Sequence, residues 1–172
     1  MGRDITPEDA VTHHQISTQH EHMTESDGSD TGEIRFRLKK GDGTAYIRTE
    51  AGNTPRWQQS HYHTLVKETY IVQRGWTVLA SVSDNGIVRF RRYEEGDIFS
   101  SPEGTIHNVY TGPQCVLHTV KHGAVSRDDR TTDASTREFD AYLRSTESQH
   151  ALQLALESGE GTTEWKDVKS RQ

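Results

Sequence analysis

HYHTLVKETYIVQRG, residues 61–75, places two histidines one residue apart and a glutamate five residues after the second. Successive side chains of a β-strand point to opposite faces, so His61 and His63 would point the same way and could both reach one ion. After the turn TLVK the chain would re-enter a strand at Glu68, whose carboxylate could return alongside the two imidazoles. A pair of exposed strand histidines explains a His-x-His pattern equally well. A metal site therefore needs a further ligand from elsewhere in the chain.

A second string, GDIFSSPEGTIH, residues 96–107, offers that ligand. It carries Gly96, Pro102, Gly104 and His107 at fixed intervals. A strand followed by a Pro/Gly turn would carry His107 across a closed sheet toward the first stretch. The two strings together are a much stronger sign of a metal site than either is alone.

The composition bounds the class of protein. A chain of 172 residues suits one domain, but a hydrophobic fraction of 30% and a mean hydropathy of -0.89 indicate that part of it stays outside any core. The net charge of -6 offers no basic excess for a phosphate backbone, so we expect no nucleic-acid partner. No stretch approaches the ~20 apolar residues of a membrane span, and we expect a soluble, cytoplasmic protein. The single cysteine, Cys115, excludes an internal disulfide and is interpreted as a small buried thiol.

Composition also divides the chain into three parts. Residues 1–31 are polar without a sustained period and are interpreted as a flexible arm. Residues 32–123 contain short alternating or apolar runs between turn signals, which is typical of an all-β sandwich or barrel. Residues 124–172 are predicted to form a helical extension and a tail. Four histidines of the arm are interpreted as incidental, since an unstructured segment loses entropy when it binds a metal. They are His13, His14, His20 and His22.

Strands are predicted over residues 34–40, 44–50, 76–82, 87–93, 97–100, 106–110 and 114–120. Asn85-Gly86 between two of these strands predicts a β-hairpin with a type I′ turn, which needs positive φ at both central residues. Residues 89–93, RFRRY, are interpreted as part of an outer strand or a subunit contact.

One or two helices are predicted beyond the barrel. Phe139 and Leu143, then Leu152 and Leu156, stand at i,i+4 spacing, and Gly159 is a C-terminal stop signal. The tail after Gly159 is expected to be frayed, although Trp165 could pack into a groove.

The two strings resemble the two sequence motifs of the cupin superfamily. The first motif is His-x-His, four residues, Glu, six residues, Gly, and residues 61–75 match it. The second is Gly, five residues, Pro, x, Gly, two residues, His, and residues 96–107 match it. Pro55 and Thr111 stand where the family usually has glycine and asparagine, positions that bear on loop shape and not on the metal. The resemblance implies an all-β cupin barrel, a double-stranded β-helix of the jelly-roll kind with a cavity at one end.

The resemblance also implies a metal site whose ligands are His61, His63, Glu68 and His107. Three imidazoles and a carboxylate suit one divalent transition-metal ion; Fe(II) is favoured, and Mn, Ni, Zn, Co or Cu fit the same donors. An octahedral ion with four protein ligands keeps two positions open for substrate, water or dioxygen.

Strand alternation from these ligands predicts further side chains in the cavity. Those expected to face inward are Trp57, Gln59, Tyr70, Val72 and Val109. Gln59 and Tyr70, with Glu68, are the candidate catalytic residues, because they could hydrogen-bond a bound oxygen or move a proton. Each is equally well explained as a side chain that merely fills the barrel. The candidate substrate-binding residues are Trp57, Arg48 and His118, although the pattern leaves the direction of His118 open.

The arginines decide whether an anionic substrate fits. In IRFRL the alternation favours Phe36 and Leu38 as the inward pair, so Arg35 and Arg37 are expected to face solvent. Arg48 is then the better candidate to receive a carboxylate or phosphate.

Fold and ligands do not decide the reaction, because similar cupins include oxygenases, isomerases, epimerases, lyases and non-catalytic binders. The favoured hypothesis is a metal-dependent enzyme acting on a small polar molecule, most simply a non-haem Fe(II) oxygenase. The first alternative is a non-redox isomerase, epimerase or lyase acting on a sugar or nucleotide-sugar-like substrate, and the second is a small-ligand-binding module. A polar cavity with Arg48 inward would favour the non-redox enzyme, and an apolar or aromatic one the oxygenase. Since cupins commonly pair through barrel edges, a homodimer is expected.

Overall fold

The protein is a two-sheet barrel with helices on one side. A computed structural model describes residues 16–24, 30–40, 45–101, 103–123 and 129–165. The strands are β1 (Ile16–Thr24), β2 (Asp30–Lys40), β3 (Ala45–Glu50), β4 (Arg56–Trp57), β5 (Lys67–Arg74), β6 (Trp76–Val82), β7 (Ile87–Glu94), β8 (Ile98–Ser100), β9 (His107–Thr111), β10 (Val116–His122) and β11 (Glu160–Glu164). The helices are α1 (Ala134–Tyr142) and α2 (Thr146–Ser158).

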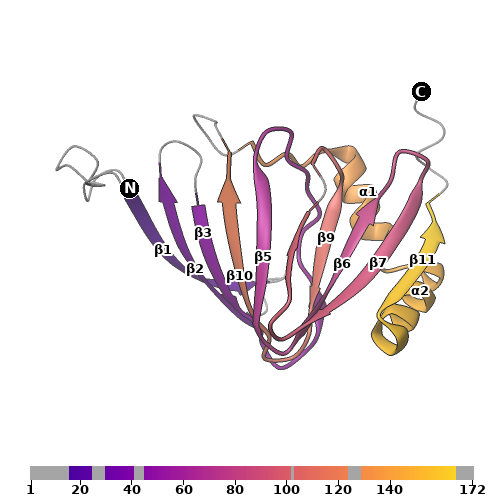
Figure 1. The fold of residues 1–172 in the computed structure, drawn as a ribbon, viewed down its shortest axis with the longest axis horizontal. Coiled ribbons are helices and arrows are strands. Elements are labelled where there is room, and N and C mark those ends of the chain that lie inside the picture. The colour runs from indigo at the N-terminus through magenta and orange to yellow at the C-terminus, as the bar shows by residue number, and fades with distance from the viewer. Residues whose placement is uncertain (1–15, 25–29, 41–44, 102, 124–128, 166–172) are drawn as a thin grey trace, which may run out of the picture.

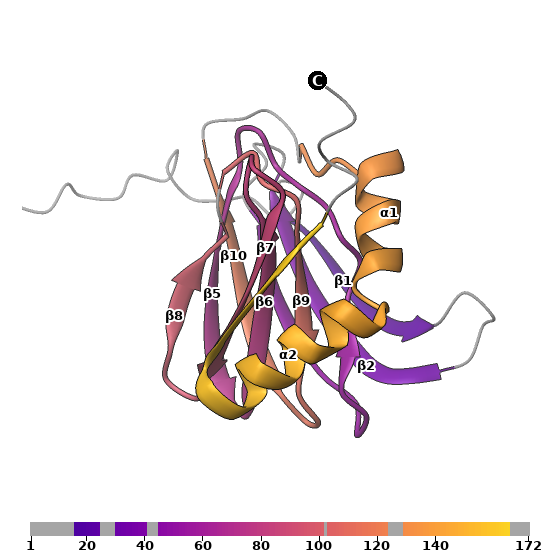
Figure 2. The same cartoon turned by 90° about the vertical axis from the view of Figure 1, so that its right-hand side faces the viewer.

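The strands form two antiparallel sheets that face each other (Figure 1). The six-stranded sheet has the order β1-β2-β3-β10-β5-β8, and the five-stranded sheet has the order β11-β7-β6-β9-β4. Figure 2 shows both helices against the outer face of the five-stranded sheet. The all-β prediction is confirmed, and the seven strands listed from the sequence are present with small shifts at their ends. The strand expected at His61 and His63 is reduced to β4 and two isolated bridges at His61 and Tyr62.

The predicted hairpin joins β6 to β7, but its turn differs from the prediction. Only Gly86 has positive φ, 78°, while Asn85 does not. The amide of Ser83 donates to the Ile87 carbonyl at 2.9 Å, and the Gly86 amide donates to the Ser83 carbonyl at 2.8 Å. The connection is therefore a three-residue loop closed by a left-handed glycine, the next most common solution for two twisted strands.

The C-terminal helices are confirmed, and the expectation of a frayed tail is wrong up to Trp165. Gly159, with φ 92°, ends α2 as its left-handed cap. The chain then forms β11, which pairs with β7, and buries Trp165 beside Phe139 with ring centroids 5.3 Å apart. No helix in the described part of the chain is long and apolar enough to cross a membrane.

The N-terminal arm also differs from the expectation. Residues 16–24 form β1, which pairs with β2 from Ile16 opposite Lys40 to Thr24 opposite Asp30. Strand pairing satisfies backbone donors and acceptors without an apolar side-chain pattern, which is why composition does not reveal this strand. The expectation for residues 1–15, including His13 and His14, lies outside the described residues, as does the motif residue Pro102.

Two hydrophobic clusters hold the barrel together. The inner one lies between the sheets and includes Val72 and Val109, as alternation predicts; its other buried members are Ala51, Tyr70, Leu79, Phe99, Cys115 and Leu117. Burial raises the pKa of the Cys115 thiol to about 11, which fits the interpretation of a buried small thiol. The outer cluster lies between the five-stranded sheet and the helices, around Phe90, Phe139 and Trp165. The inner cluster fills only part of the barrel interior. The rest of the interior can therefore carry polar side chains.

Candidate metal centre

Two histidines meet on the inner wall of the barrel because the backbone pairs them. His61 and His107 exchange backbone hydrogen bonds of 3.1 and 3.0 Å, and their ring centroids lie 4.6 Å apart. Glu68 reaches them from β5, in the opposite sheet. Its Oε2 lies 3.2 Å from Nε2 of His61 and 3.1 Å from Nε2 of His107. Ligand atoms of these three residues all lie within 4.8 Å of one another, close enough to share one ion.

The imidazoles are oriented for ligation by their other nitrogen. Nδ1 of His61 donates to the Gln59 carbonyl, and Nδ1 of His107 donates to the Thr105 carbonyl, both at 2.9 Å. A carbonyl oxygen only accepts, so each Nδ1 carries a hydrogen and each Nε2 is left to face Glu68. This is how metal-binding histidines are normally held.

The donors around Glu68 suit a divalent cation. Burial lowers the pKa of His61 to about 4, so its ring is neutral at pH 7 and Nε2 presents a lone pair. Burial alone would raise the pKa of Glu68, but His107, His61, His63 and the Lys121 ammonium hold that pKa well below its usual value. A lone pair of His61 thus faces an ionised carboxylate at 3.2 Å. A divalent transition-metal ion fits these N and O donors and would satisfy both.

His63, the remaining predicted ligand, lies beside this group in a different setting. Its Nε2 is 3.5 Å from Oε1 of Glu68 and 3.2 Å from Nζ of Lys121. Its Nδ1 donates to Oδ1 of Asp129 at 2.8 Å. His63 therefore has the orientation of a ligand, but a lysine ammonium contacts the nitrogen that would bind the ion.

Comparison with known proteins identifies the fold. No known sequence family matches the chain, and no characterised protein matches it by sequence. Among solved structures, Bacillus subtilis oxalate decarboxylase OxdC, an enzyme with Mn(II) centres, superimposes with a TM-score of 0.54 at 14% identity over 80% of this chain. The barrel is a cupin fold. The chain covers 35% of that decarboxylase chain.

Two further cupin structures are less similar. An oxalate oxidase matches with a TM-score of 0.49 and 16% identity, over 63% of this chain and 59% of its own. KdgF from Halomonas sp. matches with a TM-score of 0.43 and 16% identity, over 52% of this chain and 79% of its own. The decarboxylase match, at 14% identity, concerns the fold alone, and it confirms the resemblance of the sequence motifs at that level.

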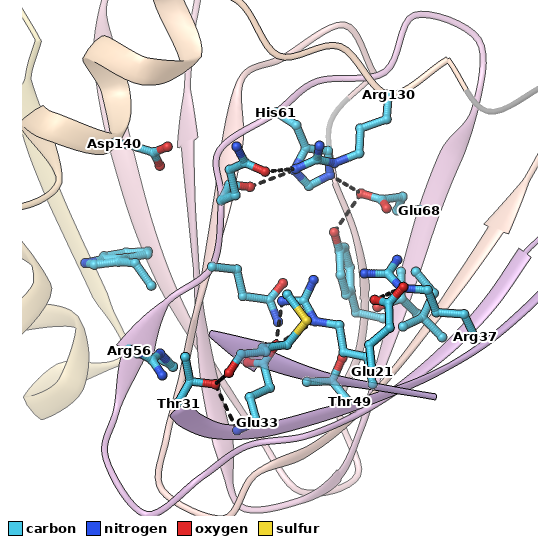
Figure 3. A pocket seen from close by; sticks show the side chains of 18 of the residues that line it. Glu21, Thr31, Glu33, Arg37, Thr49, Arg56, His61, Glu68, Arg130 and Asp140 are labelled. Carbon is cyan, nitrogen blue, oxygen red and sulfur yellow. Dashed lines mark hydrogen bonds and ion pairs between the residues drawn. The ribbon is translucent and has the colours of Figure 1, made fainter. Parts of the chain in front are cut away.

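The cluster of His61, Glu68 and His107 opens into a polar cavity of about 590 Å³. Figure 3 shows His61, Glu68 and Arg130 at one end and Thr31, Glu33 and Arg56 at the other. Five arginines line it among the described residues, from β2, β4 and the segments before and after α1. They are Arg35, Arg37, Arg56, Arg130 and Arg144. The volume suits a small-molecule ligand.

The structure corrects the assignment of arginines to faces. Arg35 and Arg37 line the cavity, while Phe36, expected to point inward, is 39% exposed. Arg35 pairs with buried Glu33 at 2.5 Å, and Arg37 pairs with Glu21 of β1 at 3.0 Å. The end of the barrel under β2 is a polar cavity and not a hydrophobic core, so the usual preference for apolar residues inside does not apply there.

Arg48 and His118, predicted to bind substrate, do not line the cavity. Arg48 pairs with Glu50, its neighbour on the same face of β3. Nδ1 of His118 lies 2.6 Å from the Tyr46 hydroxyl, and its Nε2 lies 2.6 Å from Oε1 of Gln73. These side chains form a polar network on the outer face of the six-stranded sheet, because Ile47 and Thr119 take the inward positions beside them.

The other predicted residues lie at the cavity in different ways. Tyr70 is buried, and its hydroxyl donates to Oε2 of Glu68 at 2.7 Å; burial and the nearby Glu68 charge raise its pKa well above the usual value, so it stays a neutral donor. Gln59 is exposed at the cavity wall, where its Oε1 accepts from Arg130 at 3.0 Å, and its backbone carbonyl orients His61. Trp57 lines the cavity but packs its ring on Tyr110, 4.9 Å away, at the edge of the outer cluster.

Three residues of the site have no signal in the two sequence motifs. Lys121 reaches the ligands from β10, and its inward position follows from alternation with Leu117 and Thr119 once the strand is known. Asp129 and Arg130 come from the segment before α1. A sequence alone gives no sign that this segment returns to the barrel.

Proposed function

We propose that the protein is a metal-dependent cupin enzyme that acts on a small molecule with an acidic group, by isomerase, epimerase or lyase chemistry. The observation that carries the proposal is the convergence of two imidazoles, oriented through Nδ1, on one ionised carboxylate at the wall of a polar cavity. A divalent ion would give the Nε2 atoms of His61 and His107 and Oε2 of Glu68 a common partner in this buried site.

The polar lining supports the non-redox reaction. Five arginines, from four parts of the fold, face the cavity, and guanidinium groups bind carboxylates and phosphates in a fixed planar geometry. Arg35 and Arg37, and not Arg48 as predicted from the sequence, hold the inward positions that could bind a carboxylate or phosphate. A sugar acid or a phosphorylated sugar has both the charge and the hydroxyl groups that this lining would recognise.

The residues of the chain have separate parts in this proposal. A bound divalent ion would polarise a carbonyl or acidic oxygen of the substrate. Arg35, Arg37 and Arg130 would hold the acidic group. Tyr70, a neutral phenol, keeps Glu68 in place through its hydrogen bond to Oε2. Glu68, whose pKa is held well below its usual value, would serve as a ligand of the ion and not as the acceptor of a substrate proton.

The first test is the metal content of untagged protein by plasma mass spectrometry, with His107→Ala as the ligand variant. We expect about one transition-metal ion per chain in the wild type and a sharp loss in His107→Ala. Zinc, nickel or manganese without an iron-nitrosyl signal after anaerobic nitric oxide would support the non-redox enzyme. One iron per chain with that signal would favour the oxygenase, which uses the same ligands.

The substrate class has its own test. We expect small sugar acids and sugar phosphates to raise the melting temperature of the metal-loaded protein, and neutral sugars of the same size to leave it unchanged. Arg35→Gln should remove the stabilisation by the acids. Binding without turnover of any of these compounds would favour the ligand-binding module.

A further inference from the structure

Lys121 is a buried lysine whose ammonium lies inside the metal centre. The residue is 3% exposed, on the inward face of β10. Its Nζ lies 3.3 Å from Oε1 of Glu68 and 3.2 Å from Nε2 of His63. A buried ammonium is rare and costly unless it is paired, so these contacts are part of what holds the side chain inside.

The two carboxylate oxygens of Glu68 have different partners. Oε2 faces His61 and His107 at 3.2 and 3.1 Å. Oε1 faces Lys121 at 3.3 Å and His63 at 3.5 Å. A lone pair on Nε2 of His63 that accepts a hydrogen from Lys121 cannot bind an ion at the same time. The lysine therefore occupies the place at which the fourth ligand of the cupin site would act.

From this geometry, and resting on the proposed metal dependence, we infer that Lys121 competes with the metal ion for His63 and Glu68. The ion first meets His61, Glu68 and His107, whose ligand atoms already lie within 4.8 Å of one another. His63 joins only when the ammonium leaves Nε2. Lys121 also lines the polar cavity, so the displaced ammonium has a solvated place to go.

The competition has two causes. The lysine satisfies the charge of Glu68 in the protein without an ion, which lowers the gain from binding one. A lysine that stayed in place would also lie a few ångströms from a divalent ion, where two like charges repel strongly in a buried site. Both effects weaken metal binding relative to a site without the lysine.

The test compares Lys121→Met with the matched control Lys67→Met. Methionine keeps most of the length and volume of the side chain and removes the charge. Lys67 is exposed, pairs with Glu103 at 3.4 Å at the surface, and gives the same change in net charge. Zn(II) would be titrated into the metal-free proteins by competition with a chelator of known affinity, and long-range ¹H–¹⁵N spectra would report whether Nε2 of His63 binds it.

We expect Lys121→Met to bind Zn(II) about tenfold more tightly or better, and Lys67→Met to bind it like the wild type. Without metal, Lys121→Met should melt at a lower temperature than the wild type, because Glu68 has lost its cation, and Zn(II) should reverse that loss. If Lys121→Met does not fold, Lys121→Gln is titrated in the same way and the same gain is expected.

The outcomes separate this inference from the proposed function. Equal Zn(II) affinity of the wild type and both Lys121 variants would overturn the competition and leave the metal site standing. The competition would also be overturned if the Nε2 signal of His63 shifts on metal loading while Lys121 keeps its contacts with Glu68 and His63. Binding only to the Lys121 variants would support the competition and overturn the proposed metal dependence. No binding to any of them would overturn both.

Discussion

Asp129→Asn should change the tautomer of His63, the fourth ligand of the proposed metal site, and thereby weaken metal binding. Oδ1 of Asp129 accepts from Nδ1 of His63 at 2.8 Å, and Oδ2 accepts from the amides of Thr64 at 2.8 Å and Leu65 at 2.6 Å. An asparagine has one acceptor and one donor where the carboxylate has two acceptors. If the asparagine oxygen still accepts from the amides of Thr64 and Leu65, its NH₂ group faces Nδ1 of His63. The imidazole must then carry its hydrogen on Nε2, where it cannot bind an ion.

The magnitude follows from these contacts. Replacing the charge-assisted hydrogen bonds of the Asp129 carboxylate with neutral ones and forcing the other tautomer on His63 costs about 2–4 kcal/mol of folding free energy. Partners that orient a metal-bound histidine typically contribute about 10–100-fold to metal affinity. The hydrogen on Nε2 would also face the Lys121 ammonium, 3.2 Å from that nitrogen in the wild type, which adds repulsion in the unloaded protein.

The assay is a chelator-competition titration together with urea unfolding of the metal-free protein. Asp84→Asn, the same change at an exposed turn residue, is the matched control and should alter neither quantity. A folded Asp129→Asn protein that binds metal as tightly as the wild type would refute the argument that Asp129 sets the orientation of His63. Asp129→Glu, which keeps two acceptors, should fall between the two if the tautomer is the cause.

Two further predictions concern stability. Trp165→Ala should cost about 3–5 kcal/mol in urea unfolding, since the ring is 4% exposed against Phe139 and Tyr142, and a loss below 1 kcal/mol would mean that β11 is dispensable. The pKa of Asp129 lies below its usual value, although burial opposes this, because His63 and the loop donors favour the carboxylate. The folded protein thus binds this proton more weakly than the unfolded chain does. The ionised carboxylate therefore stabilises the fold above about pH 4, and this stabilisation is lost as the pH falls further. The difference in free energy of unfolding between the wild type and Asp129→Asn should narrow below that pH.

The sequence predicts that His61, Glu68 and His107 lie together, because local rules place them. His61, Glu68 and His107 stand on or beside strands whose alternation and turn signals are visible within a few residues. The cupin motifs then place the two strings in one barrel, which periodicity alone does not. Val72 and Val109 follow from the same alternation, because their strands lie over the hydrophobic core.

Alternation fails on β2 for a physical reason. Either face of Arg35-Phe36-Arg37 satisfies a period of two, and the choice depends on what lies beneath the strand. Apolar residues take the inward face over a core, whereas here a solvated cavity lies beneath, and Glu33 with the arginines takes it. Only the three-dimensional arrangement of the ligands and the hydrophobic cluster tells which end of the barrel is hollow.

The same arrangement explains why Asp129 and Lys121 escape prediction although they set the chemistry of His63. Both act on that histidine from strands or segments more than fifty residues away, at 2.8 Å through Nδ1 and 3.2 Å through Nε2. Asp129 makes Nε2 an acceptor, and Lys121 uses that acceptor when no ion does. If the ion takes it instead, the ammonium joins the arginines of the cavity while the ion adds its own charge, so the loaded cavity is more positive than the unloaded one. By linkage, an anionic ligand must then raise the affinity for the ion by the same factor by which the ion raises the affinity for the ligand.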